Sequence, residues 1–159
     1  MPVSDAWLLT VTKQLHAAIG NLEMVHIHSD IPELIALSEV GNCCQHKVLW
    51  QEQNLSLLDI GLFLYGEPSS DKTVSNHETI FLCIITYMNE LDEVQEYGAL
   101  FSRQLPVRIK VDDKQACELP DSPEGWSILA NSCFSHKNFG VVPILNLTRI
   151  FSTQADPIG

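Results

Sequence analysis

The sequence of 159 residues has no long hydrophobic run and few basic residues. Its longest apolar segment, Ile80 to Met88, includes a threonine and is far shorter than the ~20 residues that a membrane-spanning helix requires. Only 9 Lys and Arg stand against 20 Asp and Glu, which gives a formal net charge of −11. Nucleic acids and anionic membranes are bound through basic faces, so the composition argues against both as partners.

From its cysteines and its N-terminal residues, we expect neither a disulfide framework nor a secretion signal. Its five cysteines are odd in number and include no CxxC pair: Cys43, Cys44, Cys83, Cys117 and Cys133. The N-terminus, MPVSDAWLLTV, has no basic n-region and reaches Asp5 before any long apolar run, unlike a signal peptide. We therefore expect a cytoplasmic protein with reduced thiols.

No catalytic signature is present: the sequence has no GxSxG elbow, P-loop, HExxH or GxGxxG. His26 and His28 share one face of a predicted strand, but a metal site would need further ligands from elsewhere. Cys43 and Cys44, with His46 nearby, would point in different directions in an extended chain. We therefore expect no enzyme activity, no cofactor and no bound metal, and a small metal-binding protein is the weakest alternative.

What the sequence does contain is a series of short apolar runs separated by turn residues. With 45% hydrophobic and 18% charged residues, the chain should form a globular core. Turn signals about every 8 to 12 residues predict a mainly β fold of one or two small barrels rather than a βαβ sheet. The segment 79–88 is almost continuously apolar, so we expect it to be a central strand buried on both faces.

One sequence pattern occurs twice, which favours two related barrels. Between His46 and Gly66, two apolar runs flank a polar turn at 51–54, and Asp59 then precedes apolar residues at helical spacing. Its short carboxylate is suited to cap a brief helix. The second copy spans Trp126 to Phe151, with strands predicted at 126–134 and from 139, and has Asn146 at the position of Asp59.

The order of these elements resembles CheW-like domains. Residues 23–66, EMVHIHSDIPELIALSEVGNCCQHKVLWQEQNLSLLDIGLFLYG, are similar to the first half of that family, where a strand leads through a Pro-containing segment to a G-V-x-x-x-R-G-x-x-x-P-V-x-D-L run. IFLCIITY and YGALFSRQLPVRIKVDD resemble the family's later strands, and VVPILNLTRIF resembles its closing element. The resemblance covers almost the whole chain, in pattern and spacing more than in identities.

The sequence departs from the family at the most recognisable positions. Counting back from Asp59, the family's proline falls on Ser56, its glycine on Glu52, its arginine on Gln51 and its leading glycine on His46. The family also tends to carry a glutamate near the position of His26, on a strand expected to neighbour the arginine. A neutral hydrogen bond between His26 and Gln51 would replace that ion pair without leaving a buried charge unpaired.

Membership in this family would imply one CheW-like domain over 1–159, made of two five-stranded β-barrels that share a hydrophobic interface. We expect one barrel to contain residues 1–20 plus 80–159 and the other 21–79. The resemblance implies a non-catalytic adaptor of a chemotaxis or pilus-motility system that binds a CheA-type histidine kinase, a chemoreceptor or another CheW-like protein. Its expected contacts are Leu49, Gln51, Glu52 and Leu57. A CheW-like module recruited to a different cytoplasmic assembly is the alternative.

Overall fold

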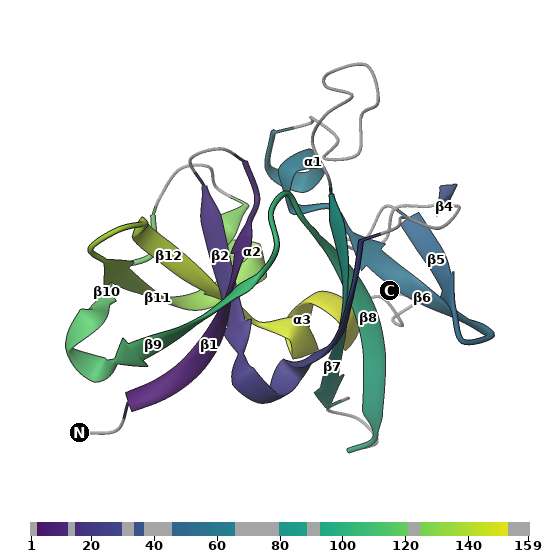
Figure 1. Ribbon diagram of the computed structural model, residues 1–159, viewed down its shortest axis with the longest axis horizontal. Helices are drawn as coiled ribbons and strands as arrows, with labels where there is room; N and C mark the ends of the chain where they lie inside the picture. The colour runs from purple at the N-terminus through teal and green to yellow at the C-terminus, as the bar shows by residue number, and fades with distance from the viewer. Residues whose placement is uncertain are drawn as a thin grey trace.

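A computed structural model describes residues 3–12, 15–29, 34–36, 46–65, 80–88, 93–120 and 125–152. Two six-stranded sheets stand side by side (Figure 1). The first has the order β10-β11-β12-β2-β1-β9, with β1 (Val3–Thr10), β2 (His16–Gly20), β9 (Val107–Asp112), β10 (Ala116–Cys117), β11 (Ala130–His136) and β12 (Gly140–Leu145).

The second sheet has the order β3-β7-β8-β6-β5-β4, with β3 (Met24–His28), β4 (Leu34–Ala36), β5 (His46–Trp50), β6 (Gln53–Leu58), β7 (Phe81–Met88) and β8 (Gln95–Ser102). The helices are short. They are η1 (Asn21–Glu23), α1 (Ile60–Tyr65), η2 (Asp113–Gln115), α2 (Trp126–Leu129) and α3 (Leu147–Ser152).

The two sheets have the same topology. Each combines an antiparallel hairpin, β1–β2 or β7–β8, with a run of four strands, β9–β12 or β3–β6. In each sheet the last strand of the run lies parallel to the second strand of the hairpin, as β12 does to β2 and β6 to β8. A short helix, α3 or α1, follows that last strand. The fold class predicted from sequence, two related β subdomains with short helices, is confirmed.

The division of the chain between the sheets differs from the prediction. Along the chain, a hairpin and a run are followed by a second hairpin and run, and each sheet takes its hairpin from one repeat and its run from the other. Strands within 24–102 form the second sheet, whereas 3–20 and 107–145 form the first. The predicted boundary at residue 80 is therefore wrong for β7 and β8, which pair with β3 and β6.

Both sheets are strongly curled, because their two edge strands are consecutive in the sequence. The edges β9 and β10 are joined by η2 alone, and β3 and β4 by the segment 29–33. Neighbouring strands lie ~4.8 Å apart, so connections this short cannot span a flat six-stranded sheet. Each sheet has six strands, whereas five were expected. The additional strand is a short one at the edge: β10 has 2 residues and β4 has 3.

The main core lies between the two sheets. Along β7, Cys83, Ile85 and Tyr87 enter this interface core, whereas Leu82 and Ile84 point into the interior of the second sheet. This alternation confirms the prediction of a strand buried on both faces. The first sheet and the helices α2 and α3 that accompany it form the first half of the molecule, and the second sheet with α1 forms the second half. The first half contributes these residues to the interface core: Leu9, Val11, Ala17, Ile19, Trp126, Leu129, Leu145, Leu147, Ile150 and Phe151.

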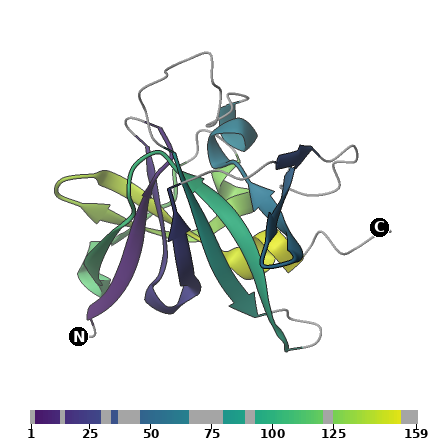
Figure 2. The ribbon, with the colours of Figure 1, turned by 45° about the vertical axis from the view of Figure 1, so that its right-hand side comes forward.

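Both predicted helix caps are present. The Leu62 backbone N–H donates to Asp59 Oδ1 at 3.2 Å, and the Arg149 backbone N–H donates to Asn146 Oδ1 at 3.0 Å. The cap on Asn146 starts α3, which crosses from the first half to pack against β7 of the second (Figures 1 and 2). The Thr148 hydroxyl donates to the Met88 carbonyl at 3.1 Å on this contact.

The predicted strand from Trp126 is a helix over its first residues. Trp126 and Leu129 are fully buried, whereas Ser127 and Ile128 between them are exposed. The Leu129 backbone N–H donates to the Gly125 carbonyl at 3.2 Å, which forms a helical turn. The spacing of buried residues is therefore that of α2, and the strand begins at Ala130.

Candidate partner-binding surface

The hairpin of β5 and β6 contains most of the residues predicted to bind a partner. Trp50 pairs with Gln53, so the turn consists of Gln51 and Glu52 alone. Both have positive φ, 48° and 64°, a conformation that suits glycine or asparagine in a two-residue hairpin turn. Gln51 and Glu52, both exposed, thus adopt a backbone conformation that is unfavourable for their residue types. They form the tip of the hairpin, which projects away from the first sheet (Figure 1).

The two leucines predicted as contacts lie on opposite faces of this hairpin. Leu49 points outward with 57% of its surface exposed, opposite the exposed Asn54. Leu57 is fully buried in the core of the second sheet, beside Val48 and Leu55. The prediction that Leu57 contacts a partner is therefore wrong in this structure, because its side chain stabilises the sheet.

His26 and Gln51 do not lie on neighbouring strands. β3, which contains His26, pairs with β7, and β5 pairs with β4 and β6. The geometry on which the predicted His26–Gln51 hydrogen bond depended is therefore absent. The ring of His26 instead contacts that of His28, with centroids 4.2 Å apart.

Within the described ranges, no group of three or more His, Cys, Asp or Glu side chains is placed to hold a metal ion. Cys43 and Cys44 lie outside the described residues, and so does the side chain of His46. None of the helices in the described part of the chain has the length and hydropathy needed to cross a bilayer.

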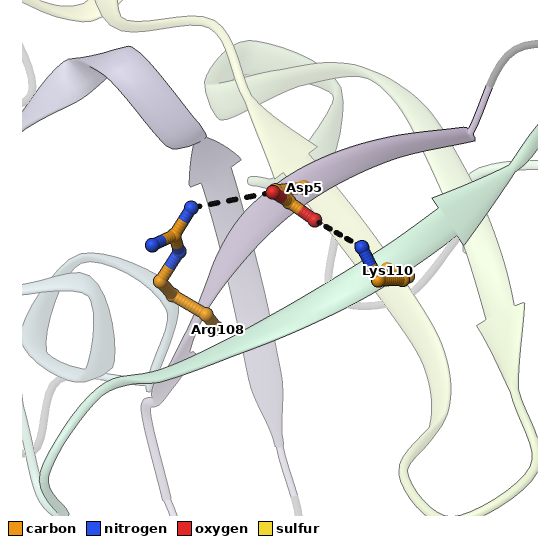
Figure 3. A network of polar contacts seen from close by, with 3 residues as sticks. All are labelled: Asp5, Arg108 and Lys110. Atoms are coloured by element: carbon orange, nitrogen blue, oxygen red, sulfur yellow. Dashed lines mark hydrogen bonds and ion pairs between the residues drawn. The ribbon is translucent and has the colours of Figure 1, made fainter.

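A charged network on the first sheet was not anticipated from sequence. Asp5 of β1 accepts contacts of 3.2 Å from both Arg108 and Lys110 of β9 (Figure 3). The Arg108 guanidinium also lies 5.7 Å from the centre of the Trp7 ring. The two basic side chains are well exposed and that of Asp5 partly so, and the ion pairs therefore add little stability. The alternation of Arg108 and Lys110 was visible, but only the strand register brings Asp5 between them.

η1 and the end of β7 each carry one exposed apolar side chain. Leu22 is 87% exposed and Met88 53%, and η1 contacts β7 directly. Beside Leu22, the carboxyl of Glu23 accepts a hydrogen bond of 2.7 Å from the Gly20 backbone N–H. Burial raises the pKa of Glu23, and the hydrogen bond from Gly20 partly opposes that shift.

The described part of the chain thus forms two curled sheets around a shared core. The chain is similar in structure to the scaffolding protein TtCheW from Thermoanaerobacter tengcongensis, with a TM-score of 0.65. The match covers 95% of this chain and 88% of that one at 11% sequence identity, so it shows the fold. No family model matches the sequence, and no curated protein matches it.

Proposed function

We propose that this protein is a non-catalytic, cytoplasmic adaptor of a bacterial chemosensory complex, formed by one CheW-like domain. The observation that supports the proposal best is the β5–β6 hairpin, which displays Leu49 on a fold shared with a CheW scaffold. Its expected partners are a CheA-type histidine kinase, a chemoreceptor or another CheW-like protein, in a chemotaxis or pilus-motility system.

The physical argument for this surface combines strain and exposure. A turn held at positive φ by Gln51 and Glu52 costs stability, and unfavourable backbone of this kind often marks a functional position. Leu49, on the same hairpin, exposes apolar surface, and burying that surface against a partner would stabilise the complex. The exposed backbone conformation and the apolar anchor thus favour protein binding over catalysis.

The departures at Gln51 and Glu52 bear on which partner is bound. The family resemblance places an arginine and a glycine there, so this tip differs from the usual one in charge and in backbone freedom. An accessory adaptor, whose partner differs from that of the main coupling protein, fits this difference best. Recruitment of the same fold to a different cytoplasmic assembly is the competing function.

The test is binding of the purified chain to the CheA-type kinase, the receptor signalling tip and the CheW-like proteins encoded in its own organism. We expect at least one to bind, and Leu49→Ala to weaken that complex by about tenfold, since burying a leucine contributes ~1.5–3 kcal/mol. Biolayer interferometry with each partner measures the dissociation constants.

A matched control is Leu105→Ala, because Leu105 is 59% exposed, close to the 57% of Leu49, but lies on the connection before β9. This variant should change affinity less than twofold. Equal losses in the two variants would place the contact elsewhere. Absence of binding to all three partner classes would favour the different assembly.

A further inference from the structure

Two thiols face each other across neighbouring strands of the first sheet. Cys117, the last residue of β10, pairs directly with Cys133 of β11 in the antiparallel register. Their Sγ atoms lie 3.2 Å apart, and both cysteines are free. Directly opposed residues in an antiparallel pair have Cβ atoms ~4.5–5.5 Å apart, slightly more than a disulfide spans. A bond between these sulfurs therefore needs only small side-chain and strand adjustments.

The two thiols differ in their surroundings. Cys133 is 3% exposed and lines a cavity of about 290 Å³, whereas Cys117 is half-buried. Burial raises the pKa of the Cys133 thiol to about 12, and the Cys117 thiol beside it adds to that shift. Cys133 therefore stays protonated near neutral pH, so oxidation should begin at Cys117, the more accessible sulfur.

The charge near the two thiols bears on which oxidant can react. Asp112 and Asp113 line the cavity together with Cys133, in a protein whose net charge is −11, while the charge of Asp5, which also lines it, is offset by Arg108 and Lys110. This field disfavours anionic oxidants such as oxidised glutathione. A small neutral hydroperoxide meets no such barrier at the half-buried Cys117.

We propose that Cys117 and Cys133 are a modification site, at which a hydroperoxide forms an intramolecular disulfide between β10 and β11. With hydrogen peroxide, the Cys117 sulfur breaks the O–O bond and becomes a sulfenic acid, and one water leaves. The Cys133 sulfur then attacks that sulfenic sulfur: the S–S bond forms, the S–O bond breaks, and the departing oxygen leaves as a second water with the Cys133 proton. Two thiols are oxidised for one peroxide reduced.

The disulfide would link β10, the shortest strand of the first sheet, covalently to β11. β10 has only 2 residues and lies at the sheet edge, where it pairs with β11 alone. Such an edge is easily frayed, and a covalent link to β11 holds it in register. The site thus couples exposure to peroxide to the order of one edge of the fold.

The test uses the 159-residue chain with Cys43→Ser and Cys44→Ser, so that Cys83, Cys117 and Cys133 are its remaining cysteines. Reduced protein is treated with hydrogen peroxide, and the free thiols are then alkylated. Trypsin leaves Cys117 and Cys133 in one peptide, 115–137, and a glutamate-specific protease cleaves it after Glu118 and Glu124. A disulfide-linked pair of fragments then identifies the bond by mass spectrometry.

We expect two thiols to be lost together while Cys83, which is fully buried, remains alkylatable after unfolding. Loss of the Cys133 thiol should be at least tenfold slower in a Cys117→Ser variant, and Cys133→Ala should abolish the linked fragments. Oxidised glutathione at the same concentration should react at least tenfold more slowly than peroxide. The far-ultraviolet circular dichroism of both variants shows that they are folded.

Three results would overturn the proposal. One is oxidation of Cys117 to sulfinic acid while Cys133 remains a thiol. Another is a dimer linked through Cys117 as the main product. The third is loss of the Cys133 thiol at the same rate with and without Cys117.

Discussion

Replacing Gly98 by alanine tests how α3 fastens the two halves together. A Cβ at Gly98, on β8 of the second sheet, would lie 2.8 Å from Cε1 and 2.9 Å from Cδ1 of Phe151, which belongs to α3. Real Cβ atoms do not approach other carbons so closely, so one group must move. The Phe151 ring is 1% exposed and stacks on Tyr87 with centroids 5.4 Å apart, which leaves it little room.

Two opposing terms set the size of the effect. Overpacking of a filled core by one methyl group typically costs ~1–3 kcal/mol. Alanine in a strand also avoids the backbone entropy that glycine loses on folding, which returns ~0.5–1 kcal/mol. The overpacking term is larger, so we expect Gly98→Ala to lower the free energy of unfolding by about 1–2 kcal/mol. For a chain of about this size, that lowers Tm by roughly 2–8 °C.

Urea unfolding followed by tryptophan fluorescence measures this loss, with circular dichroism as a second probe of two-state behaviour. Phe151→Leu provides the decisive background, because a smaller side chain vacates the space that the new methyl group needs. In that background, Gly98→Ala should be neutral or stabilising by ~0.5–1 kcal/mol. The reasoning is refuted if Gly98→Ala is equally destabilising in both backgrounds, or if it stabilises the native sequence.

Three further perturbations address the caps, the turn and the partly buried Glu23. Asp59→Ala and Asn146→Ala should each cost about 1 kcal/mol in urea unfolding, whereas Asp59→Asn, which keeps an accepting oxygen, should cost less; equal costs would contradict the cap. Gln51→Asn with Glu52→Gly should stabilise the fold by about 1 kcal/mol, measured as Tm, because both replacements favour positive φ; no gain would argue against the strained turn. Burial raises the Glu23 pKa in the folded state, so its protonated form stabilises the fold at low pH and this contribution is lost as pH rises through the folded pKa. Glu23→Gln should therefore equal the native protein below the ordinary pKa of about 4.3 and exceed it in stability above that; parallel pH curves would contradict this.

Local patterns were sufficient for the elements that depend on neighbouring residues. Asp59 and Asn146 were identified as caps because a short polar side chain stands before apolar residues at helical spacing, and both accept the expected backbone N–H. The almost unbroken apolar segment 79–88 correctly indicated a strand with no face exposed to water, apart from Met88 at its end.

Features that depend on strand pairing could not be predicted in this way. Leu57 and Leu58 point to opposite faces of β6, yet one enters the core of the second sheet and the other the interface core, so both are buried. In a hairpin with one face in water, the same alternation would leave one of these leucines at the surface, so the sequence alone could not show that both are buried. His26 likewise gave no indication that β3 pairs with β7, because the partner of a strand is set by contacts far along the chain.

The shared topology explains where function can reside in this fold. Both faces of β7 are used, one for the core of its own sheet and one for the interface core, and α3 closes the gap between the halves. Most side chains of β7 are therefore committed to packing, which leaves strands farther from that interface to supply groups that bind or react. The two proposed sites obey this condition in the same way: Leu49 lies on β5, and Cys133 on β11, the strand at the equivalent position in the other sheet. Each strand pairs on its outer side with a short edge strand, β4 or β10, so both proposed sites lie one strand in from an edge of their sheet.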